Sequence, residues 1–176
     1  MKKCIMLVLS LVLITGCTRS YDTLEAAVQS HWDTPIEIVN QDAKNQLVYY
    51  LDHTQHVLGV YYYENGRYRY NNKLSVGMRF TAESMIPFFV QAIHIEGVGN
   101  IIYGAIRSDE HKVETFVIEY KNGEFQEIKA RNNTFIAEYP PYLTTSLEMF
   151  QTEIANVIAY DNNGVFVASY KKINHN

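Results

Sequence analysis

Residues 57–70 read VLGVYYYENGRYRY, and this stretch decides the fold class. Two runs rich in β-branched and aromatic residues flank Asn65-Gly66. An Asn-Gly pair between such runs is the strongest short-range signal for a β-hairpin. Tyrosine and valine are both favoured in strands. We therefore predict an antiparallel hairpin whose tight turn is formed by Asn65 and Gly66.

The same turn signal occurs twice more along the chain. TFVIEY (115–120) leads to Asn122-Gly123 and returns as EFQEI, and NVIAY (156–160) leads to Asn163-Gly164 and returns as VFVASY. Three Asn-Gly hairpins predict a β-rich fold with antiparallel pairing. At each turn we expect positive φ at both residues, the Asn and the Gly.

Helical patterns are few and short. In DTLEAAVQSHW (22–32), Asp22 and Glu25 have the spacing of a capping box and apolar residues follow at helical intervals. TAESM (81–85) is a second candidate. SLEMFQTEIANVI (146–158) is ambiguous between helix and strand, and its length favours a helix at the start. The expected fold class is α+β. It consists mainly of antiparallel β-meander hairpins, with one N-terminal helix and one or two short helices.

The spacing of the strands suggests an internal duplication. IEI (36–38) is followed by a Tyr-x-Asn-Gly sequence at Tyr63, and IHI (93–95) is followed by another at Tyr120, with the same separation in both cases. Two tandem helix-plus-meander modules, 22–80 and 81–130, followed by a C-terminal hairpin, would explain this match. Strand-rich sequences also produce such coincidences readily, so the alternative is that no repeat exists.

The N-terminus has the features of a secretion signal. Lys2 and Lys3 precede an apolar run that ends at Cys17. A charged start followed by a short apolar run is typical of a signal peptide, whereas a bilayer-spanning helix requires about 20 apolar residues. We therefore predict a signal peptide over residues 1–16.

LITGC (13–17) resembles the lipobox of bacterial lipoproteins, in which an aliphatic residue and two small or branched residues precede a cysteine. The resemblance implies that Cys17 receives a diacylglyceryl group on its sulfur. It also implies that cleavage follows Gly16 and that the new amino group is acylated. One acyl chain gives only marginal membrane binding, whereas two or more hold firmly. The resemblance therefore implies a stable lipid anchor at the cell membrane.

Removal of residues 1–16 would make the chain more acidic. Lys2 and Lys3 leave with this segment, which takes the formal net charge from −4 to −6. The remaining length fits a β-rich globular domain over 22–176, joined to the lipidated cysteine by a short linker within 17–21. The acidic balance argues against nucleic acid and anionic lipid headgroups as partners, because both prefer a basic face. No disulfide is expected, since Cys4 leaves with the signal peptide.

Taken whole, the chain resembles the small uncharacterised lipoproteins of Bacillus-type Gram-positive bacteria. Beyond the lipobox, the likeness rests on an acidic, Tyr- and Asn-rich mature domain that opens with TLEAAVQSHWDTPIEIV (23–39). The resemblance implies a place on the extracytoplasmic face of the cell membrane and no particular activity. Thr18 after the cysteine is also compatible with outer-membrane sorting, so a Gram-negative source stays open.

The first hairpin carries the candidate binding surface. A two-residue turn pairs Tyr63 with Tyr68 and Tyr61 with Tyr70, which places the four rings on one face as a ladder. Exposed, the ladder would offer an aromatic platform to an envelope protein or a glycan, since tyrosine is favoured at interfaces. Packed under a helix, it would be an ordinary part of the core. The alternation along the strand does not decide between the two.

Patterns for catalysis or metal binding are scarce. His53 and His56 lie beside Asp52, but a structural zinc site requires a fourth ligand, so we expect a polar turn and neither metal nor cofactor. The chain contains no G-x-S-x-G, H-E-x-x-H or glycine-rich phosphate loop. We expect a non-catalytic, membrane-anchored binding module. The alternatives are a small cell-envelope enzyme, with a site assembled from scattered His and carboxylate residues, and a structural spacer.

Overall fold

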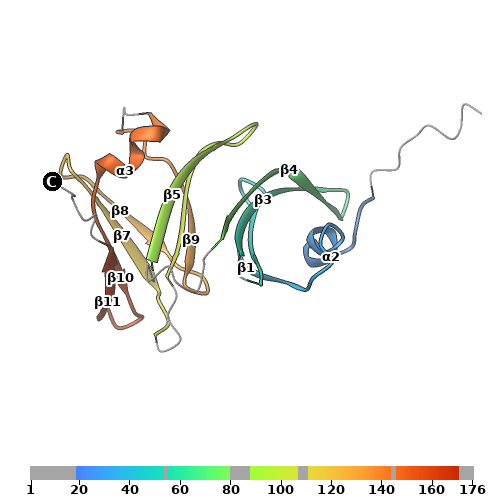
Figure 1. The fold of residues 1–176 in the computed structure, drawn as a ribbon, viewed down its shortest axis with the longest axis horizontal. Helices are drawn as coiled ribbons and strands as arrows, with labels where there is room; N and C mark the ends of the chain where they lie inside the picture. The colour runs from blue at the N-terminus through green and yellow to red at the C-terminus, as the bar shows by residue number, and fades with distance from the viewer. Residues whose placement is uncertain (1–18, 54, 80–87, 107–110, 144–145, 171–176) are drawn as a thin grey trace, which may run out of the picture.

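The computed structural model describes residues 19–53, 55–79, 88–106, 111–143 and 146–170. Within these ranges the chain forms three antiparallel sheets, a short N-terminal helix and a short helical segment before the last hairpin (Figure 1). The predicted α+β class, dominated by antiparallel hairpins, is confirmed.

The first sheet is a meander in the order β1-β2-β3-β4. Its strands are β1 (Ile36–Asp42), β2 (Leu47–Asp52), β3 (Gln55–Glu64) and β4 (Arg67–Arg79). Successive residues of β2 point to opposite faces. Val48 and Tyr50 pack toward the helix, and Leu47 and Tyr49 pack toward the rest of the molecule. Both faces of this sheet are therefore covered along β2.

Helix α2 (Leu24–Gln29) covers the outer face of this sheet with Leu24, Ala27 and Val28, which are buried. Its N-cap is Thr23, whose hydroxyl accepts a hydrogen bond from the Ala26 backbone N–H at 3.1 Å. The expected Asp22–Glu25 capping box is wrong, because Asp22 lies one residue before the cap and its carboxylate pairs with Arg67. Threonine is itself a favoured residue at the cap position.

The remaining strands form two sheets. The second has the order β5-β6-β9, with β5 (Phe88–Ile95), β6 (Gly99–Ile106) and β9 (Thr134–Glu138). The third has the order β11-β10-β7-β8, with β7 (Thr115–Tyr120), β8 (Phe125–Lys129), β10 (Ile154–Tyr160) and β11 (Phe166–Tyr170). A 3-10 turn η2 (Leu147–Met149) and helix α3 (Phe150–Glu153) lead directly into β10, so the helix expected at the start of 146–158 is present.

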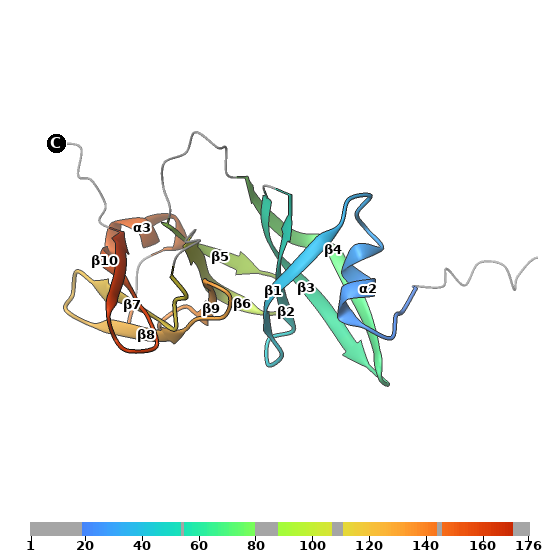
Figure 2. The ribbon, with the colours of Figure 1, turned by 90° about the horizontal axis from the view of Figure 1, so that it is seen from below.

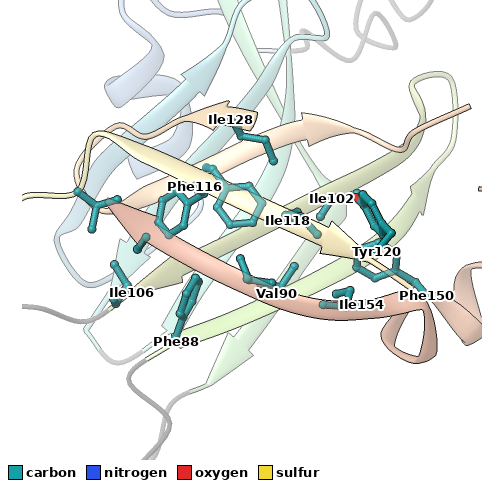
Figure 3. Close-up of a cluster of buried hydrophobic side chains, with 14 of the residues drawn as sticks. Phe88, Val90, Ile102, Ile106, Phe116, Ile118, Tyr120, Ile128, Phe150 and Ile154 are labelled. Carbon is teal, nitrogen blue, oxygen red and sulfur yellow. The ribbon is translucent and has the colours of Figure 1, made fainter. Parts of the chain in front are cut away.

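The second sheet is the central layer of the fold (Figures 1 and 2). Along β6, Ile101 and Tyr103 pack against the first sheet, while Ile102 packs with Phe116 and Ile118 of the third. Figure 3 shows the cluster between the second and third sheets, in which side chains of β5 and β6 meet those of β7 and β10. A strand buried on both faces has a continuous apolar run, and IIYGAI (101–106) is such a run.

The three Asn-Gly hairpins are present, but only the first turn has the expected backbone. Asn65 and Gly66 have φ of 53° and 77°. At the other two turns only the glycines have positive φ, 89° at Gly123 and 74° at Gly164.

The second and third turns differ from the first in the length of their loops. The Tyr120 N–H donates to the Glu124 carbonyl at 2.9 Å, and the Asp161 N–H donates to the Val165 carbonyl at 3.0 Å. Each bond closes a three-residue loop whose glycine is the left-handed residue. The expectation of positive φ at both residues is therefore wrong for these two turns, because their loops are one residue longer.

The two segments suggested as tandem modules have different strand orders. The strands of 22–80 form one meander, whereas those of 88–129 are divided between the second and third sheets. IEI (36–38) lies at the start of the edge strand β1, whereas IHI (93–95) lies at the end of the edge strand β5. The helix candidate TAESM (81–85) lies outside the described residues.

A turn at Asn132-Asn133 joins the layers. Both residues have positive φ, 48° and 58°, and they connect β8 of the third sheet to β9 of the second. The Asn132 side-chain amide donates to the Val39 carbonyl of the first sheet at 2.9 Å, and that of Asn40 donates to the Thr134 carbonyl at 3.3 Å. These bonds fasten the first sheet to the other two.

Candidate functional site

The tyrosine ladder has the predicted register. Tyr61 pairs with Tyr70 and Tyr63 with Tyr68, on either side of a Tyr62–Arg69 pair. The ladder face is the one that turns toward helix α2, since Tyr61 and Tyr70 share a buried cluster with the apolar residues of that helix. The helix covers only part of the ladder, so its two rungs differ in exposure.

The inner rung, Tyr61 with Tyr70, belongs to the core. The two residues are 2% and 8% exposed. The Tyr70 hydroxyl lies 2.7 Å from the Tyr50 hydroxyl, and Tyr61 accepts a hydrogen bond from the Gln41 amide at 2.6 Å. Burial raises the pKa of both phenols, so they stay neutral. The rings of these two candidate residues are therefore almost fully enclosed.

The outer rung is open to solvent. Tyr63 is 51% exposed and Tyr68 is half-buried, and their ring centroids lie 4.6 Å apart. On the other face of the hairpin, Tyr62 is 37% exposed and the Arg69 guanidinium lies 5.6 Å from the centre of its ring. Arg69 also pairs with Glu64 at 2.9 Å. The accessible tip is thus made of three tyrosines and a cation, and two of these residues, Tyr62 and Arg69, were not part of the predicted binding surface.

The first described residues are fastened to this hairpin. Tyr21, predicted to belong to the linker, exchanges two backbone hydrogen bonds of 2.8 Å with Tyr68 on the outer edge of β4. Arg67 donates to the Ser20 carbonyl at 2.7 Å and forms an ion pair with Asp22. The chain therefore enters the fold at Ser20, directly beside the exposed end of the ladder.

A groove of about 420 Å³ lies between the entering chain, the end of α2 and β4. Residues that line it include Arg19, Tyr21, His31, Tyr62, Arg69 and Tyr70. The exposed His31 ring packs on Tyr70 with centroids 5.4 Å apart. Among the described lining residues there are two guanidiniums and no carboxylate, so this groove suits an anionic or polar group with an apolar part.

His53, His56 and Asp52 do not come together as a metal site. His56 lies between the rings of Tyr49 and Phe89, with Nδ1 3.0 Å from the Tyr49 hydroxyl. Asp52 is buried and accepts a hydrogen bond from Thr34 at 2.5 Å, while His53 is exposed at a residue with φ of 48°. No group of three potential metal ligands occurs among the described residues.

Two further hollows lie where the first and second sheets meet, of about 370 Å³ and 260 Å³. Asn45 and Val98 line both, and Lys44 reaches Glu138 across this seam at 2.6 Å. Each hollow has a single carboxylate among its described lining residues, Glu138 in the larger and Glu96 in the smaller, and neither is lined by a described histidine.

Other exposed apolar side chains are scattered over the third sheet. Phe125 and Phe166 are 66% and 59% exposed. Phe125 of β8 pairs with Glu119, near the end of β7. Phe166 of β11 pairs with Tyr160 of β10, which in turn pairs with Thr115 at the start of β7. The two phenylalanines therefore lie toward opposite ends of the sheet. Single exposed apolar residues are normal on protein surfaces. At the tip of the β3–β4 hairpin, exposed Tyr63 adjoins the half-buried ring of Tyr68.

Gly16 and Cys17, the predicted cleavage and lipidation residues, lie outside the described residues. Within the part of the chain that the structure does describe, no helix is both long and apolar enough to cross a membrane. Comparison of the chain with protein-family profiles, curated proteins and solved structures finds no match.

Proposed function

We propose that the protein is a non-catalytic binding module, held on the extracytoplasmic face of the cell membrane by lipid on Cys17. Its interaction surface is the tip of the β3–β4 hairpin, formed by Tyr62, Tyr63 and Tyr68 with Arg69. The lipobox-like LITGC (13–17) supports the anchor. The domain follows the anchor without a long spacer, because the chain joins the sheet at Tyr21.

The observation that carries the proposal is the exposure of the outer rung. Tyr63 is 51% exposed and its ring contacts that of half-buried Tyr68, while Tyr61 and Tyr70 are enclosed. Tyrosine gives a large contact area at low entropic cost and is enriched at interfaces. A neighbouring arginine adds a charged donor that a partner can use. The adjoining groove beside Arg19 extends the same surface.

The polar groups around the tip favour binding over acid–base chemistry. Among the described residues that line the groove, His31 is the single histidine and none carries a carboxylate. A general acid–base site requires groups that converge on one reacting atom. The tip instead presents aromatic faces and guanidiniums that are paired with carboxylates.

The proposal is tested by placing a photo-reactive phenylalanine analogue at position 63 of the full chain in intact cells. We expect a covalent adduct at position 63 and none at position 166, which is a similarly exposed aromatic position on the third sheet. A spacer, or an enzyme with its site elsewhere, would give no adduct at 63 beyond that at 166. Such a result would contradict the proposal.

A further inference from the structure

We infer that the partner of the hairpin tip is the lipid headgroup layer of the membrane that carries the anchor. This inference rests on the proposed function, since it takes the lipid on Cys17 as its starting point. It names the occupant of that surface, formed by Tyr62, Tyr63 and Tyr68 with Arg69 and flanked by Arg67, and it fixes how the domain stands on the membrane.

The first argument is reach. Cys17 lies four residues before Tyr21, and an extended chain spans at most about 3.5 Å per residue, so Cys17 lies within about 14 Å of Tyr21. Tyr21 is bound to Tyr68 by two backbone hydrogen bonds, and the ring of Tyr68 contacts that of Tyr63. The headgroup region of one leaflet is about 5–8 Å thick. Acyl chains on Cys17 therefore hold the tip at or next to this region.

The second argument is chemistry. Tyrosine is enriched where membrane meets water, because its ring prefers an apolar contact and its hydroxyl prefers a polar one. Arginine places its apolar stem along such a surface and its guanidinium on phosphate oxygens. The tip combines exposed Tyr62 and Tyr63 with Arg67 and Arg69, whose guanidiniums form solvent-exposed ion pairs with Asp22 and Glu64. Arg19 lies on the entering chain beside them.

The third argument is charge. The protein as a whole is acidic, but the tip carries Arg19, Arg67 and Arg69 against Asp22 and Glu64. A locally balanced, slightly basic tip is not repelled by a headgroup layer. It also needs no excess of anionic lipid, so contact occurs with zwitterionic phosphatidylcholine. This agrees with the net negative charge of the mature chain, which disfavours anionic headgroups for the molecule as a whole.

The contact would orient the whole molecule. The first described residues, α2 and the free end of the β3–β4 hairpin lie at one end of the long axis, and the third sheet lies at the other (Figures 1 and 2). With the tip on the membrane, the first sheet is proximal and the third sheet projects away. Phe166, on the third sheet, therefore serves as a distal reference position.

The test uses the full, lipidated chain in vesicles of phosphatidylcholine brominated near the headgroup, which quenches nearby tryptophan. Trp32 is the single native tryptophan, and its quenching in the wild-type protein gives the baseline. We expect the Tyr63→Trp variant to be quenched well beyond this baseline and the Phe166→Trp variant not to be. Both positions are about half exposed or more, so the substitutions preserve the core.

Equal quenching at positions 63 and 166, or none above baseline at 63, in protein that stays on the vesicles would overturn the inference. The tip would then face away from lipid, and an adduct at position 63 in cells would identify a protein or glycan instead. Failure of the anchor is a separate outcome, because chains without lipid on Cys17 would show no acyl mass and the proposed function itself would fail.

Discussion

The ring of Tyr70 lies against the backbone of Gly59, on the neighbouring strand. A Cβ atom at Gly59 would meet the ring and the hydroxyl of Tyr70 at 2.6 Å. Glycine in the interior of a strand often marks such a close approach. The inner rung of the ladder therefore depends on a residue that contributes no side chain.

Gly59→Ala is expected to destabilise the protein by about 1–3 kcal/mol, the usual cost of overpacking a core. Tyr70 is held by the Tyr50 hydroxyl and cannot move aside freely. The measurement is urea-induced unfolding of both forms. Gly77→Ala is the matched control on the adjacent strand, where the nearest atom is the flexible Gln55 amide oxygen at 3.3 Å. Equal costs at both positions would contradict the close packing of Tyr70.

Tyr70→Phe is expected to lower the free energy of unfolding by about 1 kcal/mol, the net contribution of one buried hydrogen bond. The substitution keeps the ring and removes the 2.7 Å contact with Tyr50, which retains the hydrogen bond from Trp32. Tyr63→Phe, on the exposed rung, should change stability by less than about 0.5 kcal/mol. Thermal or urea unfolding of the two variants compares them, and a larger effect at Tyr63 would reverse the assignment of inner and outer rungs.

The register of the ladder could be predicted from the sequence, but its exposure could not. The turn at Asn65-Gly66 and the two-residue period of a strand are local, and together they determine which tyrosines pair. What covers each rung depends on α2, which comes from a distant part of the chain and packs on β4. Tyr21 pairs with Tyr68 through two backbone hydrogen bonds, which a side-chain pattern does not predict.

The candidate metal ligands also show that the local sequence does not determine what surrounds a side chain. His53 and His56 are close in sequence, but strand alternation and a left-handed residue at His53 send them into different surroundings. The turn at Asn132-Asn133 could have been predicted from the sequence, because asparagine is enriched among the residues with a Cβ that adopt positive φ. The pairing of β6 with β9 and of β7 with β10 is long-range and has no such local signal.

Stability should fall as the pH is lowered from 6.5 toward 4. Burial between Tyr49 and Phe89 lowers the pKa of His56 from 6.5 to about 4. Between pH 6.5 and 4 the unfolded chain binds a proton at His56 that the folded protein does not bind. The contribution of neutral His56 to the free energy of unfolding is therefore complete above pH 6.5 and is lost as the pH falls toward 4. The ring is only partly buried, so we expect a loss of about 1–2 kcal/mol, less than the full shift implies.

The check on His56 is urea unfolding of the wild type and of His56→Gln at several values between pH 4 and 7. Glutamine keeps a hydrogen-bond acceptor for Tyr49 and cannot be protonated in this range. The variant should show a flatter dependence of unfolding free energy on pH. An unchanged slope would assign the pH dependence to other groups.

Asn132→Ala is expected to cost about 1–3 kcal/mol, because alanine at φ of 48° is strained and the hydrogen bond to Val39 is lost. Asn132→Gly removes the same hydrogen bond but adopts this φ without strain, so it should cost less. Unfolding by urea separates the two contributions. A glycine variant as unstable as the alanine variant would show that backbone strain has no part.

The lipid anchor is tested most directly by incorporation of labelled palmitate into the wild-type protein and into Cys17→Ser in the producing cells. The chain enters its fold at Ser20, so only a few residues separate the domain from Cys17. We predict that the wild-type protein is labelled, with a mature chain that begins at Cys17, and that Cys17→Ser is not. Equal labelling of both proteins, or an unlabelled wild type, would contradict the lipid anchor and with it the proposed function.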